Sequence, residues 1–201
     1  WDGEKAIKMF QSAIEYQEKS QSAIFLGMSW AFQGVGYYMI GEHGTAMKLL
    51  EKGIKMQTDM MLPFMIALMQ VYLSMIHFDL KHFNEANALA EQALKQAQTN
   101  REKWVEGFAW ILLGRTNGKM EGAQLQKAEE CIFTGMKILE ELKVKILYSV
   151  GVFFLGEFYA HTGRREESLK NLTLAEGLFQ EMGINYWLAR TEIILANLKG
   201  G

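Results

Sequence analysis

The most constraining feature of the sequence is a pair of small residues that recurs at a nearly constant interval. The first members recur about every 40 residues, a period that is typical of stacked helical hairpins. A second small residue follows each first member seven positions later, which gives the pairs Ala6/Ala13, Ala46/Gly53, Ala86/Ala93, Ala128/Gly135 and Ser168/Ala175. Seven positions make two turns of an α-helix, so both members share one helix face, where small side chains let another helix approach closely.

A second pattern marks the other helix of each predicted hairpin. The segments read Trp30-x2-Gln33-Gly34-x2-Tyr37, Gln70-x2-Leu73-Ser74-x2-His77, Trp110-x2-Leu113-Gly114-x2-Asn117 and Val152-x2-Leu155-Gly156-x2-Tyr159. The Gly or Ser of each segment precedes the following small pair by the same interval, except Gly114, whose interval is two positions longer. We therefore expect a two-residue insertion in the turn over 117–122.

These two patterns together resemble the tetratricopeptide repeat (TPR), whose consensus is W-x2-L-G-x2-Y followed by A-x3-F. The likeness holds in register over four copies and covers nearly the whole chain. The period exceeds the usual one of about 34 residues, and the only proline, Pro63, does not end a second helix. The chain is therefore similar to the long-repeat variety in kinesin light chains and in C-terminal regions of bacterial nucleotide cyclases and ATP-dependent transcription activators. The ending EMGINYWLARTE resembles the ends of some such bacterial signalling proteins.

The resemblance implies an all-α fold, a right-handed α-solenoid of antiparallel helix pairs with about ten helices, as one array over residues 1–201. The opening WDGEKAIKMF is typical of a turn and second helix, so we expect a fragment of a larger protein. The predicted parts are a second helix of a truncated repeat over 1–20, repeats over 22–58, 60–98, 100–142 and 143–183, and a capping helix over 185–198. That last helix could equally be the first half of another repeat. Thr99 and Glu102 have the spacing of a capping box opening a helix.

Charge and cysteine content narrow the function classes. The net charge is −2 with both signs interspersed, which argues against nucleic-acid binding, since that requires a basic stripe. The single cysteine, Cys131, rules out an intrachain disulfide framework and favours a reducing, cytoplasmic setting, with the thiol as a buried small hydrophobe. No charge occurs between Lys19 and Glu42 or between Asp59 and Asp79. Polar residues interrupt both runs, so they predict packed first helices and no membrane span.

The sequence indicates no catalytic chemistry, no metal site and no cofactor. His77 and His82 are five positions apart, a spacing that separates them on a helix, and His77 replaces a tyrosine of the repeat, which suggests a hydrogen-bonded core histidine. Adjacent carboxylates such as Glu129/Glu130 and Glu166/Glu167 are typical of solvated faces. Neither a nucleophile–histidine arrangement nor a phosphate-binding loop is present. An enzyme is not expected.

The resemblance implies that first helices line a concave groove where partner peptides lie. The candidate groove residues are Met28, Phe32, Val35, Tyr38, Met39, Val71, Tyr72, Met75, Asp79, Phe108, Ile111, Arg115, Phe153, Phe154 and Glu157. The lysine and asparagine clamp that some relatives use for a terminal carboxylate is not matched. Methionine and aromatic side chains suit contact with an amphipathic helix. Alternatively, much of the stripe packs between successive first helices. The members we expect to be more exposed are Tyr38, Tyr72, Asp79, Arg115 and Glu157.

These observations favour a non-catalytic protein-interaction scaffold within a larger signalling or regulatory protein. Its expected partner is a protein or peptide with an apolar or amphipathic segment, with no nucleic acid and no membrane involved. One alternative is a sensor for a small hydrophobic ligand, as the similarity to transcription activators suggests. The other is self-association, for example as a homodimer, through the Ile7/Phe10/Ile14 face or through the last helix.

Overall fold

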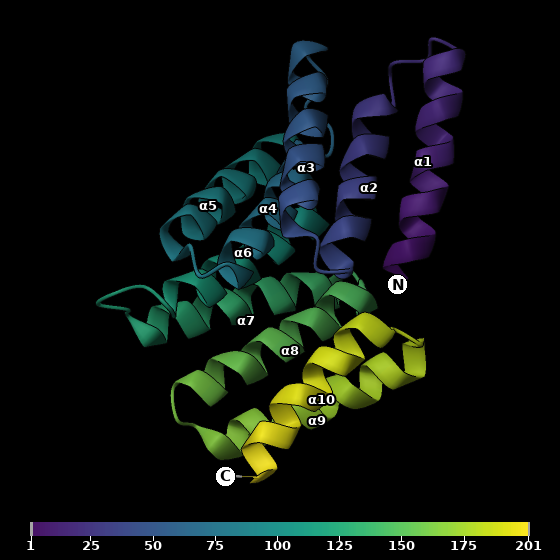
Figure 1. Ribbon diagram of the computed structural model, residues 1–201. Coiled ribbons are helices and arrows are strands. Elements are labelled where there is room, and N and C mark those ends of the chain that lie inside the picture. Colours follow the sequence, from purple (N-terminus) through teal and green to yellow (C-terminus); the bar gives the residue numbers. More distant parts are fainter. Residues whose placement is uncertain (1, 201) are drawn as a thin grey trace. The chain divides into compact units, whose positions relative to one another are not determined.

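The computed structural model describes residues 2–200, and this part of the chain folds into ten α-helices arranged as sequential antiparallel pairs (Figure 1). The all-α, TPR-like solenoid predicted from the repeat pattern is confirmed. The helices are α1 (Gly3–Lys19), α2 (Leu26–Met39), α3 (His43–Asp59), α4 (Ile66–Asp79), α5 (Phe83–Asn100), α6 (Lys103–Asn117), α7 (Leu125–Glu141), α8 (Lys145–His161), α9 (Arg165–Met182) and α10 (Asn185–Gly200).

The helices fall into two compact units, Asp2–Arg101 and the residues from Glu102 onward. In the first unit α2 pairs with α3 and α4 pairs with α5, while α1 packs against α2. In the second unit α6 pairs with α7 and α8 pairs with α9, while α10 packs against α9 and α8. The expectation of a single continuous array remains a prediction.

The recurrent small residues lie where the two helices of each hairpin meet. Ala46, Ala86, Ala128 and Ser168 have no exposed surface, which confirms the contact predicted from the repeat. A Cβ on Gly34 would lie 3.0 Å from the carbonyl oxygen of Ala46. At positions where serine replaces glycine or alanine, its hydroxyl donates a hydrogen bond to the backbone of the facing helix. Ser74 Oγ donates to the Ala86 carbonyl at 2.7 Å, and Ser168 Oγ donates to the Gly156 carbonyl at 2.8 Å.

The turns repeat with the same period as the hairpins. Second helices are followed by a residue with positive φ at Gln21, Met61, Arg101, Lys143 and Gly183. Only the last of these is a glycine, and it ends α9 in the left-handed conformation that is common at helix C-termini. The longer turn expected between α6 and α7 is present, with Gly122 at a φ of 71°.

Three local expectations differ from the structure. The helices α2 and α4 begin at Leu26 and Ile66, later than the predicted repeats over 22–58 and 60–98 begin, because Ala23–Phe25 and Pro63–Met65 form the turns that precede them. The capping box at Thr99 is wrong. Helix α5 continues through Asn100, and the Thr99 hydroxyl donates to the Lys95 carbonyl within that helix. None of the described helices is long and apolar enough to cross a membrane.

The close approach in the α6–α7 hairpin generates a stability prediction. A Cβ on Gly135 would collide with the carbonyl oxygen of Gly107, whereas a Cβ on Gly177, in the middle of α9, would meet nothing within 4 Å. We expect Gly135→Ala to lower the free energy of unfolding by about 2 kcal/mol through overpacking. The matched Gly177→Ala variant should raise it by about 1 kcal/mol through helix propensity. Urea denaturation followed by circular dichroism measures both, and equal effects would contradict the assigned contact.

Candidate partner-binding surface

The candidate groove residues occupy one stripe of each first helix, and most of the stripe is buried. Those with under a tenth of their surface exposed are Val35, Tyr38, Val71, Tyr72, Met75, Phe108, Ile111, Arg115, Phe153 and Phe154. Those that keep an intermediate exposure are Met28, Phe32, Met39, Asp79 and Glu157. The alternative that much of the stripe packs between helices therefore describes α4, α6 and α8 well.

The expectation that the polar members would be the more exposed ones is wrong for Tyr38, Tyr72 and Arg115, which are buried. In two cases the cause is a polar bond between successive first helices. Within the first unit, the Tyr38 hydroxyl donates to Asp79 Oδ2 at 2.8 Å, which joins the end of α2 to the end of α4. Buried polar groups require such partners, because desolvation without a hydrogen bond costs free energy.

In the second unit a charged pair performs the same task. Arg115 donates from Nε and Nη2 to the two carboxylate oxygens of Glu157, at 2.7 and 3.2 Å, and so joins α6 to α8. Its guanidinium carbon also lies 4.0 Å from the centre of the Phe154 ring. The arginine side chain is 3% exposed and the glutamate side chain 21%. Arg115 and Glu157 thus connect neighbouring repeats, and neither offers an open charge to a ligand.

The stripe on α2 differs from the others because it remains partly open. Phe25, Met28, Phe32 and Met39 follow one another at spacings of three, four and seven positions, which places them on one face. Phe25 is 57% exposed, and the Phe32 ring stacks on Phe10 of α1 with the ring centres 5.3 Å apart. We call Phe10, Phe25, Met28, Phe32 and Met39 the α2 face. This surface is largely apolar. Its members Met28, Phe32 and Met39 belong to the predicted groove and remain partly exposed.

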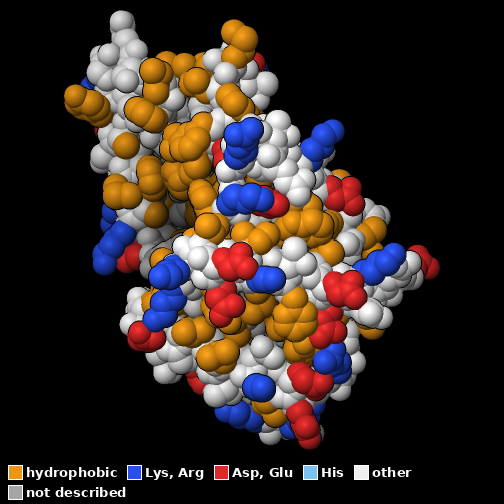
Figure 2. All heavy atoms as spheres, turned by 180° about the vertical axis from the view of Figure 1, so that it is seen from behind, with side chains coloured by type: hydrophobic (Ala, Val, Ile, Leu, Met, Phe, Trp, Pro, Cys, Tyr) orange, Lys and Arg blue, Asp and Glu red, His pale blue; other side chains and the backbone are white. Residues whose placement is uncertain are grey.

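The turns that precede α2 and α4 add exposed apolar residues that the sequence analysis does not select. Ile24 is 56% exposed, Phe64 is 55% exposed and Met61 is 87% exposed. Ile24 and Phe64 are one repeat period apart, so they are equivalent positions of successive repeats. In the sequence, both turns fall within the two uncharged runs. Because these runs are interpreted as packed helices, the exposed turns within them are not predicted. Figure 2 shows hydrophobic side chains gathered over the unit that contains α1–α5, and charged side chains interspersed over the other unit.

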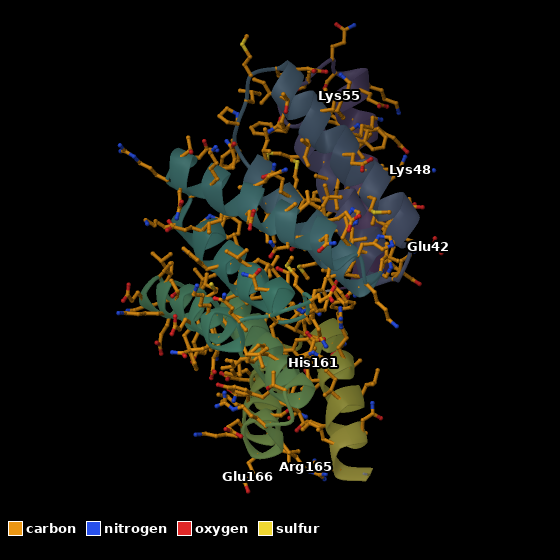
Figure 3. All side chains as sticks on the ribbon, turned by 90° about the vertical axis from the view of Figure 1, so that its left-hand side faces the viewer. Glu42, Lys48, Lys55, His161, Arg165 and Glu166 are labelled. Atoms are coloured by element: carbon orange, nitrogen blue, oxygen red, sulfur yellow. The ribbon has the colours of Figure 1, made fainter. Side chains whose placement is uncertain are left out.

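Most of the carboxylates lie on solvated faces, as expected. In Figure 3, Glu166 and Arg165 point away from the start of α9, and Glu42, Lys48 and Lys55 lie along the outer side of α3. Glu129 is the exception, because it accepts hydrogen bonds from the Tyr159 hydroxyl and from Arg164 Nη1. Burial and that carboxylate raise the pKa of Tyr159 above its ordinary value. This cluster joins α7, α8 and the turn before α9.

The histidines and the cysteine form no reactive site in the described residues. His77 is partly buried, but its Nδ1 has no hydrogen-bond partner, so the expected hydrogen-bonded core histidine is wrong for that atom. Burial, and then His82 with its ring centre 5.7 Å away, lower the pKa of His77. Burial raises the pKa of the Cys131 thiol, which disfavours the reactive thiolate. No group of three or more histidine, cysteine or acidic residues in 2–200 could hold a metal ion.

Several solved structures of known proteins share this architecture. No protein-family model matches the sequence, and no curated protein matches it significantly. Solved structures do. A Rap protein complexed with Competence and Sporulation Factor aligns with a TM-score of 0.75 and 18% identity over 94% of this chain. BtubC (BKLC) from P. vanneervenii gives a TM-score of 0.63 and 17% identity over 90% of this chain and 75% of its own.

A third match, the Q17M form of a putative kinesin light chain from Podosopora anserina with nearly identical TPR-like repeats, gives a TM-score of 0.57 at 18% identity, covering 90% of this chain and 88% of its own. The chain is thus a TPR-like helical-repeat protein by fold. This agrees with the resemblance drawn from the sequence. It spans about half of the Rap protein, 52% of that chain.

The Arg115–Glu157 pair generates a second stability prediction. Glu157→Gln leaves the buried guanidinium without its carboxylate, so we expect the free energy of unfolding to fall by about 2 kcal/mol. The exposed pair of Lys145 and Glu181, also joined at 2.7 Å, is the matched control. Glu181→Gln should change the free energy of unfolding by less than about 0.5 kcal/mol. Chemical denaturation of both variants at neutral pH measures the difference, and a loss in the control alone would contradict it.

Proposed function

We propose that this chain is a non-catalytic protein-interaction module that binds the apolar side of a partner helix at the α2 face. The single observation that carries the proposal is the half-open pair of Met28 and Phe32, because the equivalent residues of α4, α6 and α8 are buried. Contiguous apolar patches are uncommon on the surfaces of monomeric soluble proteins, and where they occur they often mark interaction sites.

The chemistry of the α2 face defines the partner. Phe10, Phe32 and Phe25 supply rigid aromatic surface, and Met28 and Met39 supply adaptable surface around it. The run from Ser20 to Gly41 brings no formal charge to α2. An acidic or basic peptide therefore finds no complementary charge on this helix. A helix with apolar residues at spacings of three, four and seven suits a row with the same spacings.

The comparisons support this proposal at the level of fold. The Rap structure contains Competence and Sporulation Factor as a bound component. A module that combines a TPR-like fold with an exposed apolar row suits a regulatory role in a larger signalling protein, and we extend the proposal to that role.

At the α2 face, the alternative of a small-ligand site has less support. The apolar hollow beside the α2 face, lined by Phe32, Val35, Leu68 and Tyr72 among others, has a volume of about 10 Å³. This is space for at most one water molecule, whereas small-molecule sites usually occupy several hundred Å³.

The experiment uses helical peptides selected for binding to the 201-residue chain. Phe25→Asp should weaken the affinity of the selected peptides at least about tenfold, because the carboxylate must be desolvated beneath the bound helix. Phe25 is mostly exposed, so the variant should fold normally. Phe133→Asp on α7, at a residue 48% exposed, is the matched control and should bind as the parent does.

Isothermal titration calorimetry gives the affinities, and circular dichroism verifies the helix content. Equal affinity for the Phe25→Asp variant and the parent chain would reject the α2 face as the binding surface. Selected peptides without amphipathic spacing would reject the proposed partner class.

A further inference from the structure

The hairpin of α4 and α5 carries glutamine at two positions where the other repeats have hydrophobic residues. Gln70 stands at the first position of the first-helix signature, where the other repeats have Trp30, Trp110 and Val152. Gln96 lies ten positions after the small residue Ala86. The equivalent residues of the other second helices are Tyr16, Met56, Ile138 and Leu178. One hairpin thus presents two amides in place of two hydrophobic side chains.

Both glutamines line a hollow between α3, the turn before α4, α4 itself and α5, with a volume of about 410 Å³. We call this space the glutamine hollow. Its apolar wall includes Ile54, Leu62 and Ile66, each of which is partly exposed. None of the described residues that line it carries a charge. Small-molecule sites usually have volumes of roughly 300 to 1,000 Å³ and combine an apolar lining with a few polar groups.

The turn that closes one side of the glutamine hollow is held by hydrogen bonds from α3 and α5. Gln57 Nε2 donates to the Phe64 carbonyl at 3.0 Å, and Asn100 Nδ2 donates to the Pro63 carbonyl at 3.1 Å. Met61, in the same turn, has a φ of 55°. A residue other than glycine keeps this conformation only where its surroundings hold it. The hollow is therefore formed in advance, and a ligand does not have to order it.

The two amides offer complementary hydrogen-bonding groups. Gln96 Nε2 donates to Asn100 Oδ1 at 3.2 Å, which orients the amide and leaves Gln96 Oε1 as an acceptor. The Gln70 side chain is partly exposed, but its Oε1 is buried without a hydrogen-bond partner. The last torsion of a glutamine side chain has a broad energy profile, and rotation about it exchanges the oxygen and the nitrogen. Gln70 can therefore offer either a donor or an acceptor to a ligand.

We propose that the glutamine hollow binds an uncharged small molecule in which a carboxamide is joined to a short apolar chain. The carboxamide nitrogen donates to Gln96 Oε1, and its carbonyl accepts from Gln70 Nε2. The apolar chain lies against Ile54, Leu62 and Ile66. A charged ligand is disfavoured, because its desolvation is costly and the lining residues supply no opposite charge.

The glutamine hollow is separate from the α2 face. No residue of the α2 face is among the described residues that line the hollow. The inference therefore goes beyond the proposed protein-interaction role. Phe25→Asp, which tests that role, should leave ligand binding in the hollow unchanged, so the two proposals can fail separately.

Three probes of matching shape test the inference on the isotope-labelled 201-residue chain: hexanamide, heptan-2-one and hexanoate. Heptan-2-one has a methyl group in place of the amide nitrogen, and hexanoate has a negatively charged oxygen there. In heteronuclear NMR, hexanamide should cause saturable shifts of the backbone amide signals around the hollow, such as those of Leu62 and Gln70. The other two probes should bind at least about tenfold more weakly, because neither can donate a hydrogen bond to Gln96.

Two variants locate the binding site. Gln70→Trp introduces the residue type of α2 and α6, fills the hollow and should abolish the binding of hexanamide. Gln180→Trp, at an exposed position of α9, is the matched control and should bind as the parent does. Gln96→Met introduces the α3 residue at the equivalent position. It should weaken the binding of hexanamide at least about tenfold and leave that of heptan-2-one unchanged.

Three results would overturn the proposal. The first is hexanamide that causes no saturable shifts. The second is equal affinity for hexanamide and heptan-2-one, which would make the hollow a purely apolar site. The third is a folded Gln70→Trp or Gln96→Met variant that binds hexanamide as the parent does. Circular dichroism establishes that each variant is folded, and Gln96→Met alone carries the test if Gln70→Trp loses helix content.

Discussion

The approach of two helix backbones within each hairpin is the constraint on which the rest of this structure depends. At Gly34 and Ala46, and again at Gly114 and Ala128, no side chain larger than a methyl group separates the helices. This proximity buries the intervening residues such as Leu50 and Ile132 completely. It also fixes how each helix is rotated, and hence which stripe it turns toward the next repeat. Since stability in a repeat protein comes from such units and their nearest-neighbour contacts, an error in one hairpin would misplace the following one.

The hairpin contacts could be predicted because their two halves lie close together in the sequence, within a single repeat. Exposure of the first-helix stripes could not, because it depends on contacts with the following repeat. The Tyr38–Asp79 and Arg115–Glu157 bonds show the difference. Taken singly, a tyrosine or an arginine in an apolar stripe suggests an exposed position. A partner one repeat later supplies the compensating hydrogen bond and permits burial. Spacing within one repeat carries no information about that partner.

The apolar turns escape sequence reasoning for a different physical reason. Four of the five turns that follow second helices place a residue other than glycine at positive φ, as at Met61 and Lys143. Glycine normally signals this conformation. Without it, the uncharged runs resemble continuous helices, and Ile24 and Phe64 fall on surfaces predicted to be packed. The repeat register does indicate these turns, because Gly183, which ends α9 with a positive φ, lies at the position equivalent to Met61 and Lys143.

The α2 face consists of positions that the other first helices largely bury. Met28 and Phe32 keep an intermediate exposure, whereas the equivalent residues of α4, Leu68 and Tyr72, are buried. Phe25 and Phe32 project bulky rings, which suit insertion between the side chains of a partner helix. Met28 lies between them in the sequence, and its flexible side chain can adapt to the shape of that helix. Rigid and adaptable apolar side chains on one helix face therefore favour an apolar helix as the partner over a charged one.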